Sequence, residues 1–324
     1  MNQAMQPIRV FGFSHDMGHH LSWLFLFLHS RNLMIKDEFV MERIAYYNGK
    51  IDTPENLTVP FLDRVCFFGD GVYDATASSN GVIYLLDEHV DRLYNSAGLI
   101  GIKIPYTKDE LKAILNDVVS RVDNKHNIVY FQVTRGTAPR NHAFPDDDVP
   151  ANLWIMVNPK QFRDFSVPMK LTSMEDKRFL YCNVKTLNLL PSVLAAQKAE
   201  VDGCDETVFH RGNIVTECAH SNVSILKDGI IYTHPNDEYI LPGIAKNHFF
   251  IACNKLGIPV SQTAFTLDDL RNADEVFVTS SSNFCSFADT FEGKPVGCKA
   301  PETVKAIQDA VIQEYLNYCG IDSL

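Results

Sequence analysis

The sequence predicts a two-domain protein of mixed α+β and α/β class. Its 324 residues are enough for two domains, each with its own hydrophobic core. The first half contains two hairpin signals and two amphipathic helices, whereas the second half mixes short strands with helices. Between the halves, residues 158–170 combine two prolines with four charged residues. We therefore expect a small α+β domain at residues 41–160, a linker at 161–166 and a larger domain at 167–324.

Residues 1–40 differ in character from the rest of the chain and are interpreted as a poorly ordered N-terminal extension. The apolar run Trp23–Leu28 is too short to span a bilayer, and the segment before it carries little positive charge. A signal peptide or membrane anchor is the alternative. The folded unit is expected to begin near Met41.

Composition and charge favour a small-molecule partner. The chain has 46% hydrophobic residues and a net charge of −11, from 29 basic and 40 acidic residues. Nucleic-acid binding requires a basic face, and no Lys/Arg run is present, so we expect neither nucleic-acid nor membrane binding. The eight cysteines form no Cys-x-x-Cys pair. This pattern indicates no disulfide framework and no zinc or other metal site, and it favours a reducing, cytoplasmic location.

Two Asn-Gly pairs indicate tight hairpin turns in the first domain. Asn48-Gly49 follows the strand-like segment IAYY, and Asn80-Gly81 interrupts the alternating stretch GDGVYDATASSNGVIYLL. Asn and Gly are favoured here because two-residue hairpin turns require positive φ angles. Both segments are therefore predicted to be antiparallel hairpins.

Helices are expected after the second hairpin and near the C-terminus. Asp87 is assigned as the N-cap of the first helix, and Arg92 lies beside its apolar face. Thr107 is assigned as the N-cap of the second, which runs to Val122. Two more helices are expected, from Gly243 to about residue 255 and over residues 302–318. Strands are expected over residues 127–135, 152–158, 208–210, 214–216, 223–227, 230–233 and 275–280.

Lys185 lies at the junction of two apolar patterns. Residues 181–185 alternate as on a strand, and apolar residues from Leu189 onward recur at helical spacing. A lysine held uncharged in apolar surroundings costs a domain about 4 to 7 kcal/mol, so it usually has a chemical role. The alternative is a lysine that extends its ammonium group to solvent at a strand end.

Other polar residues lie at the ends of predicted elements, where scaffolds present functional groups. Glu217 follows a strand in TECAHSN, and its alternative role is that of an ordinary turn carboxylate. In LPGIAKNHFF, Gly243 begins a helix whose free N–H groups and positive dipole end can bind phosphate, as many helix starts can. Residues 280–282 are three serines after a strand, which serve either as phosphate donors or as a polar cap.

Arg140 and His142 lie two apart in the loop after the 127–135 strand. In an extended loop both side chains point to one side, where they could grip a carboxylate. Solvated loop side chains are the alternative.

The order of these features resembles that of the fold-type IV pyridoxal-phosphate enzymes, and among them the D-amino acid aminotransferases. The resemblance covers about residues 43–320. It is carried by the motifs FGDGVYD, EHVDRLYNSA, IPYTKDE, YFQVTRGTAPRNHAFP, VKTLNLLPSVLAAQKA, TECAHSN, DGIIYTHP and FVTSSS. It implies a homodimer, with a small α+β domain joined to a larger α/β pseudo-barrel domain that binds pyridoxal 5'-phosphate.

The resemblance also implies a role for each matched residue. Lys185 would form the Schiff base with the cofactor aldehyde, and Glu217 would keep the pyridine nitrogen protonated. The phosphate would be held by Arg92, the backbone N–H groups of Ile244 and Ala245, and Ser281. The substrate α-carboxylate would be bound by Tyr73, Arg140 and His142, the last two from the neighbouring subunit.

These roles imply transfer of the amino group of D-alanine or another D-amino acid to a 2-oxo acid such as 2-oxoglutarate. The alternatives within the fold are an L-branched-chain aminotransferase and a 4-amino-4-deoxychorismate lyase, which lack the same Arg-x-His loop. A non-catalytic cofactor-binding protein would have lost the lysine, the glutamate or the carboxylate-binding residues. Two positions depart from the family pattern, because Ala245 and His220 stand where hydroxyl residues are usual.

Overall fold

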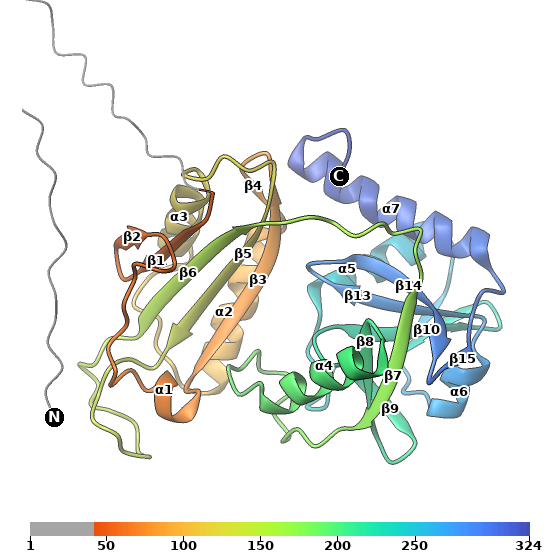
Figure 1. Ribbon diagram of the computed structural model, residues 1–324, viewed down its shortest axis with the longest axis horizontal. Coiled ribbons are helices and arrows are strands. Elements are labelled where there is room, and N and C mark those ends of the chain that lie inside the picture. The colour runs from red at the N-terminus through yellow and green to blue at the C-terminus, as the bar shows by residue number, and fades with distance from the viewer. Residues whose placement is uncertain (1–41) are drawn as a thin grey trace, which may run out of the picture. The chain divides into compact units, whose positions relative to one another are not determined.

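The computed structural model describes residues 42–324, which contain two β-sheets (Figure 1). The first sheet has six antiparallel strands in the order β2-β1-β6-β5-β3-β4. Its strands are β1 (Ile44–Tyr47), β2 (Lys50–Asp52), β3 (Gly71–Ser79), β4 (Val82–Ile83), β5 (His126–Thr134) and β6 (Asn152–Pro159). The interpretation of residues 1–40, and of the Trp23–Leu28 run within them, lies outside the described residues.

Both predicted hairpins are confirmed. Asn48 and Gly49 have φ angles of +45° and +90°, and Asn80 and Gly81 have +51° and +74°. Positive φ at both central residues is the geometry of a type I′ turn, whose twist matches that of paired strands. The two strands of the second hairpin differ in length, because β4 has only two residues.

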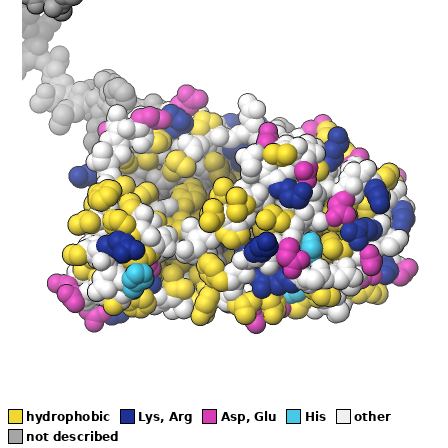
Figure 2. All heavy atoms as spheres, turned by 60° about the horizontal axis from the view of Figure 1, so that its bottom comes forward, with side chains coloured by type: hydrophobic (Ala, Val, Ile, Leu, Met, Phe, Trp, Pro, Cys, Tyr) yellow, Lys and Arg dark blue, Asp and Glu magenta, His cyan; other side chains and the backbone are white. Residues whose placement is uncertain are grey.

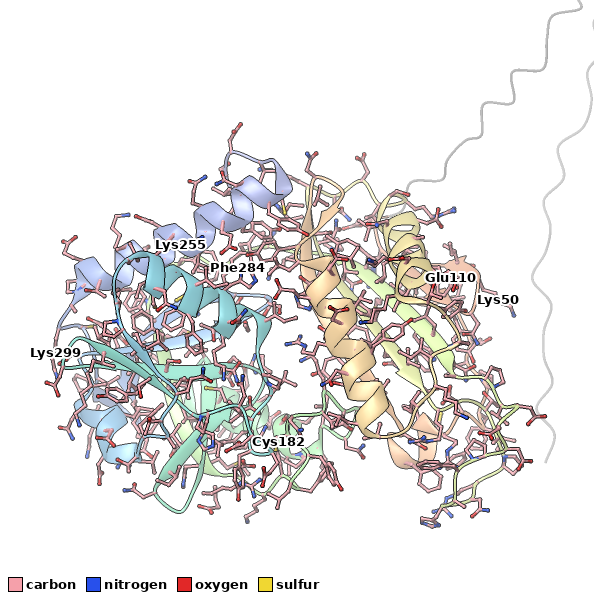
Figure 3. The ribbon with its side chains drawn as sticks, turned by 180° about the vertical axis from the view of Figure 1, so that it is seen from behind. Lys50, Glu110, Cys182, Lys255, Phe284 and Lys299 are labelled. Atoms are coloured by element: carbon pink, nitrogen blue, oxygen red, sulfur yellow. The ribbon has the colours of Figure 1, made fainter. Side chains whose placement is uncertain are left out.

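Helices α2 (Leu86–Leu99) and α3 (Lys108–Val119) cover one face of this sheet, while the one-turn helix α1 (Val65–Phe68) precedes β3 (Figure 3). Thr107 caps α3 in a full capping box with Glu110, as predicted. The assignment of Asp87 as a cap is wrong. Leu85 occupies the N-cap position of α2 with φ of +50°, and Asp87 lies in the first turn, where its charge still favours the helix dipole.

The second sheet has nine strands, eight of them in the order β12-β11-β10-β13-β14-β7-β8-β9, with β15 paired to β14. Its strands are β7 (Met169–Glu175), β8 (Glu206–Arg211), β9 (Ile214–Cys218), β10 (Asn222–Lys227), β11 (Ile230–Thr233), β12 (Val260–Ser261), β13 (Glu275–Ser280), β14 (Phe284–Phe291) and β15 (Lys294–Pro295). β9 ends the strand path and β10 is its third member, yet only three residues join them. The sheet must therefore curve round on itself, and the short turn between β9 and β10 faces inward.

Four helices accompany the second sheet: α4 (Leu190–Asp202), α5 (Ile244–Lys255), α6 (Leu267–Asn272) and α7 (Pro301–Cys319). Helices α5 and α7 pack with β13 and β14 around the buried aromatic residues Phe249, Phe277, Phe284 and Tyr315. The predicted helix starts at Gly243 and near residue 302 are confirmed within one residue.

The predicted strand over residues 181–185 is wrong. These residues form an irregular loop that meets β3 at a single bridge, between Val72 and Thr186. Tyr73 N–H also donates to the carbonyl of Lys185 at 2.9 Å. Five alternating residues suit a loop that touches a sheet at one point as well as they suit a strand, so alternation alone did not distinguish the two. Strands β7 and β14 were not predicted.

Residues 160–168, which join β6 to β7, form neither helix nor strand. The linker at 161–166 lies inside this stretch, and the domain boundaries stay a prediction. No helix within residues 42–324 is both long and apolar enough to cross a membrane.

Replacing Gly136 with alanine is expected to destabilise the protein by about 3 kcal/mol. Gly136 has φ of +109°, and a Cβ there would lie 2.4 Å from the carbonyl oxygen of Pro150. Gly98→Ala in α2 is the control, because its Cβ would meet nothing within 4 Å and alanine favours a helix. Urea-induced unfolding measures both variants. Unchanged stability of Gly136→Ala would contradict this backbone geometry.

Candidate functional site

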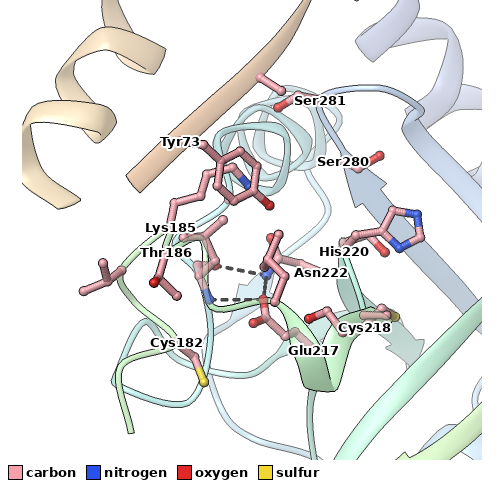
Figure 4. A pocket seen from close by; sticks show the side chains of 18 of the residues that line it. Tyr73, Cys182, Lys185, Thr186, Glu217, Cys218, His220, Asn222, Ser280 and Ser281 are labelled. Atoms are coloured by element: carbon pink, nitrogen blue, oxygen red, sulfur yellow. Dashed lines mark hydrogen bonds between the residues drawn. The ribbon is translucent and has the colours of Figure 1, made fainter. Parts of the chain in front are cut away.

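A cavity of about 330 Å³ collects side chains from both sheets (Figure 4). Most of the residues singled out in the sequence line it. They are Tyr73, Arg92, Lys185, Glu217, Ile244, Ala245 and Ser281. They come from β3, α2, the loop before α4, the end of β9, the start of α5 and the segment just after β13. The volume is that of a pocket for a small organic ligand.

Lys185 enters the cavity from a loop that is held by its backbone. Its N–H donates to Ser96 Oγ at 3.1 Å, and its carbonyl accepts from Tyr73 N–H at 2.9 Å. Its Nζ lies 4.5 Å from the centroid of the Tyr73 ring. Figure 4 shows Tyr73 and Lys185 together on one side of the cavity. The residue is half-buried, and its side chain lines the cavity.

Glu217 lies at the end of β9, where the sheet turns inward, and is 5% exposed. Its Oε1 accepts from Arg178 Nη1 at 2.5 Å, and its Oε2 accepts from Asn222 Nδ2 at 2.9 Å and from Leu241 N–H at 3.1 Å. Burial raises the pKa of the Glu217 carboxyl, and the charge of Arg178 opposes that rise. With three hydrogen bonds made, the carboxylate keeps one acceptor position for a ligand.

Arg178 and Asn222 are site residues that the sequence reasoning missed. Arg178 also donates to both oxygens of Asp176 at 2.9 Å, and its guanidinium lies 4.6 Å from the centroid of Phe209. Asn222 is the last residue of the TECAHSN motif, but it was assigned no role from the sequence. Nothing about Arg178 in MEDKRFLYC marks it, because its partner Glu217 lies 39 residues away in the sequence.

Arg92 is held rigidly in the wall formed by α2. Its Nε and Nη2 bind both oxygens of Asp74 at 2.8 and 2.7 Å, while Nη1 lies 3.4 Å from the carbonyl of Pro242. His89 Nδ1 lies 2.7 Å from the same carboxylate. Burial alone would raise the pKa of Asp74, but the charge of Arg92 and then that of His89 hold it well below its ordinary value. The buried carboxylate fixes the guanidinium and leaves Nη1 nearest to α5.

The start of α5 presents N–H groups of the kind that bind anions at helix N-termini. Gly243 occupies the N-cap position of α5, so no side chain at that position accepts a hydrogen bond from the first N–H groups of the helix. A Cβ at Gly243 would lie 2.0 Å from Asn222 Oδ1, so only glycine allows this close approach. Ser281 lines the same end of the cavity. Thr279 Oγ1 also lines the cavity and is buried with no hydrogen-bond partner among the described residues.

Arg140 and His142 do not line the cavity. Both are exposed, and both pack on Phe68, with the Arg140 guanidinium 5.2 Å and the His142 ring 5.3 Å from its centroid. They therefore share one side of their loop, as their spacing indicates. Within this chain they are separated from the other predicted site residues.

The two departures from the family pattern differ in consequence. Ala245 offers only its backbone N–H. His220 lies opposite Lys185 in Figure 4, and its Nδ1 is 2.8 Å from Glu206 Oε2. That hydrogen bond raises the pKa of His220. His220 also lines a neighbouring cavity of about 370 Å³. Within residues 42–324, no group of three or more His, Cys, Asp or Glu residues could hold a metal ion.

Replacing Arg178 with glutamine is expected to cost about 3 kcal/mol of stability at about pH 7 and less at about pH 5. Without Arg178, the already raised pKa of Glu217 rises further. A carboxyl with a raised folded-state pKa lowers stability increasingly as pH rises above its unfolded pKa, so the loss grows with pH.

Urea-induced unfolding at the two pH values checks this expectation. Lys198→Gln, which breaks the more exposed Lys198–Asp202 pair, is the control and should cost below about 1 kcal/mol. An Arg178→Gln loss that does not vary with pH would rule out Glu217 as its cause.

Comparison with known proteins agrees with this geometry. The family model of the class IV aminotransferases matches residues 71–287. D-alanine aminotransferase of Listeria monocytogenes serotype 4b (strain F2365) is 40% identical over 279 residues, covering 84% of this chain and 96% of that protein. D-alanine aminotransferase of Bacillus licheniformis is 35% identical over 276 residues, covering 83% and 97%.

Solved structures show the same fold. The branched-chain amino acid aminotransferase of Escherichia coli has a TM-score of 0.77 at 21% identity, covering 86% of this chain and 95% of that one. A second branched-chain amino acid aminotransferase, complexed with N-(5'-phosphopyridoxyl)-L-glutamate, has a TM-score of 0.76 at 23% identity, covering 86% and 98%. The predicted fold class is confirmed, and the chain belongs to the class IV aminotransferase family.

Proposed function

We propose that this protein is a pyridoxal-phosphate-dependent D-amino acid aminotransferase, which moves the amino group of D-alanine or another D-amino acid to a 2-oxo acid such as 2-oxoglutarate. The observation that carries the proposal is that the Lys185 amine and the buried Glu217 carboxylate line the same cavity. The relatives at 35–40% identity bear the name D-alanine aminotransferase.

The donors at the α5 end of the cavity fit the phosphate of the cofactor. Arg92 supplies a fixed positive charge, the N–H groups of Ile244 and Ala245 lie at the positive end of a helix dipole, and Ser281 adds a hydroxyl. Glu217 at the other end would accept a hydrogen bond from the ring nitrogen of the cofactor. Arg178 and Asn222 keep this carboxylate in position.

Bound pyridoxal phosphate would supply an electron sink for the negative charge that develops on the substrate α-carbon. Lys185 Nζ would take the proton from the substrate α-carbon and return it to a carbon of the cofactor. This role requires a neutral amine during turnover. Tyr73, which lies beside Lys185 and stacks on Tyr130 at 5.4 Å between centroids, would face the substrate carboxylate. Glu217 would stay ionised next to the ring nitrogen and so favour its protonated form.

We also propose a homodimer in which Arg140 and His142 of one subunit complete the carboxylate-binding site of the other. Two observations support it. Both side chains are exposed and lie away from their own cavity. Figure 2 shows apolar side chains gathered on the face where Figure 1 places α1 and α4. Exposed apolar residues in and near these helices are Phe61, Leu62, Phe144, Phe179, Leu180, Tyr181, Leu190, Val193, Leu194 and Val201.

An L-branched-chain aminotransferase is the second candidate, because it shares the fold, the lysine and the glutamate. The solved structures cited above bear that name, but at 21–23% identity they support the fold alone. The Arg140-x-His142 loop favours the D-amino acid enzyme.

The eight cysteines, all free, support the proposed cytoplasmic location.

Lys185→Ala is expected to lower the rate of transamination by about a thousandfold or more, because no other residue replaces its amine. Pyruvate formation from D-alanine, with 2-oxoglutarate as acceptor, measures the rate. Lys198→Ala, which alters an exposed lysine of α4, is the control and should keep full activity. Activity of the wild-type protein with L-alanine or L-leucine but not with D-alanine would favour the L-branched-chain aminotransferase.

Arg140→Ala is expected to raise KM for D-alanine about tenfold or more and to leave cofactor affinity unchanged. Co-expression with Lys185→Ala subunits then tests the dimer. A hybrid dimer would hold one site with both defects and one intact site, so the purified hybrid should recover about half of the wild-type activity. A hybrid as impaired as its parents would place Arg140 in its own subunit's site.

A further inference from the structure

His248 lies beyond the cavity, yet it joins the two helices that carry the proposed phosphate-binding groups. It is 7% exposed. Its Nε2 lies 2.9 Å from Glu88 Oε1, and its Nδ1 lies 2.8 Å from Glu314 Oε1. The three residues belong to α2, α5 and α7. One buried ring therefore connects three helices from distant parts of the sequence.

Both ring nitrogens of His248 are used in these contacts. Each lies within hydrogen-bond distance of a glutamate carboxylate, so the ring bridges two acidic side chains. Within residues 42–324 neither glutamate makes another salt bridge. Two further titratable residues lie nearby: Tyr84, whose ring centroid is 6.3 Å from that of His248, and His89, which lines a small neighbouring cavity together with His248. Removing the His248 ring would leave both glutamates without this partner.

The position of His248 along α5 relates it to the proposed phosphate site. Ile244 and His248 are related as i and i+4 in α5, and Glu88 and Arg92 have the same relation in α2. Such pairs share a helix face, one turn apart. The His248–Glu88 contact thus lies one turn from the place where Arg92 meets α5. The direct contact there, from Arg92 Nη1 to the Pro242 carbonyl, is long at 3.4 Å and holds the helices weakly.

We propose that His248 is a positioning residue, whose contacts with Glu88 and Glu314 hold α2 against α5 at the spacing at which Arg92 and the α5 N-terminus bind one phosphate group. The inference rests on the proposed function and adds to it a residue that lies outside the cavity. Loss of the contact with Glu88 is expected to lower cofactor affinity.

Titration of the cofactor-free protein with pyridoxal phosphate, followed by cofactor absorbance, tests the inference. His248→Gln should raise the dissociation constant about tenfold, because its amide has one nitrogen in place of the two ring nitrogens that contact the carboxylates. The matched control is His210→Gln, which removes another His–Glu pair, with Glu175 at 3.3 Å, far from α2 and α5 in sequence and contacts. It should match the wild type throughout.

Glu88→Gln provides a second variant that should fold normally, because the Glu88 side chain is 42% exposed. It should also weaken binding, and combining it with His248→Gln should add little. A purely structural role would lower the melting temperature and leave the dissociation constant for pyridoxal phosphate unchanged. Equal dissociation constants for the wild type and His248→Gln would overturn the inference. A wild type that binds no pyridoxal phosphate would instead refute the proposed function, and this inference with it.

Discussion

The buried ion pair between Arg178 and Glu217 is the interaction around which the cavity is arranged. A carboxylate at the end of β9 could not remain buried without a cation, and the loop before α4 provides one that is itself held by Asp176. Asn222, in the first position of β10, binds the second oxygen. The protein thus stabilises the negative charge of Glu217 before any ligand binds, and this is the charge that a protonated ring nitrogen needs beside it.

Opposite charges are separated along the cavity. The end near α5 carries Arg92 and the positive end of a helix dipole, whereas the other end carries the Glu217 carboxylate. Between them, Lys185 is held by its backbone to β3 and to Ser96 on α2, so its long side chain extends into the cavity from a fixed backbone. A ligand with a phosphate at one end and a protonated nitrogen at the other matches this distribution of charge.

Both sheets contribute to this site, so their packing matters for it. Asp74 on β3 and Arg92 on α2 belong to the first sheet and its helices, while α5 accompanies the second. His248 and the Ser79–Tyr315 hydrogen bond of 2.5 Å tie the two layers together on the side of α7. The relative position of the cavity walls therefore depends on contacts between layers that no single sheet contains.

The sequence by itself determined the features that depend on neighbours within a few residues. These are the Asn-Gly hairpin turns, the Thr107 capping box and the helix that begins after Gly243. The order of the motifs also indicated the family and singled out Lys185 and Glu217, because residue types at element ends are visible in a sequence.

Only the tertiary structure decided that Arg178 is the partner of Glu217, that residues 181–185 form a loop, and that Arg140 lies away from its own cavity. The His248–Glu88 contact joins residues 160 positions apart. Such contacts join residues that are far apart in the sequence, and local periodicity carries no information about them.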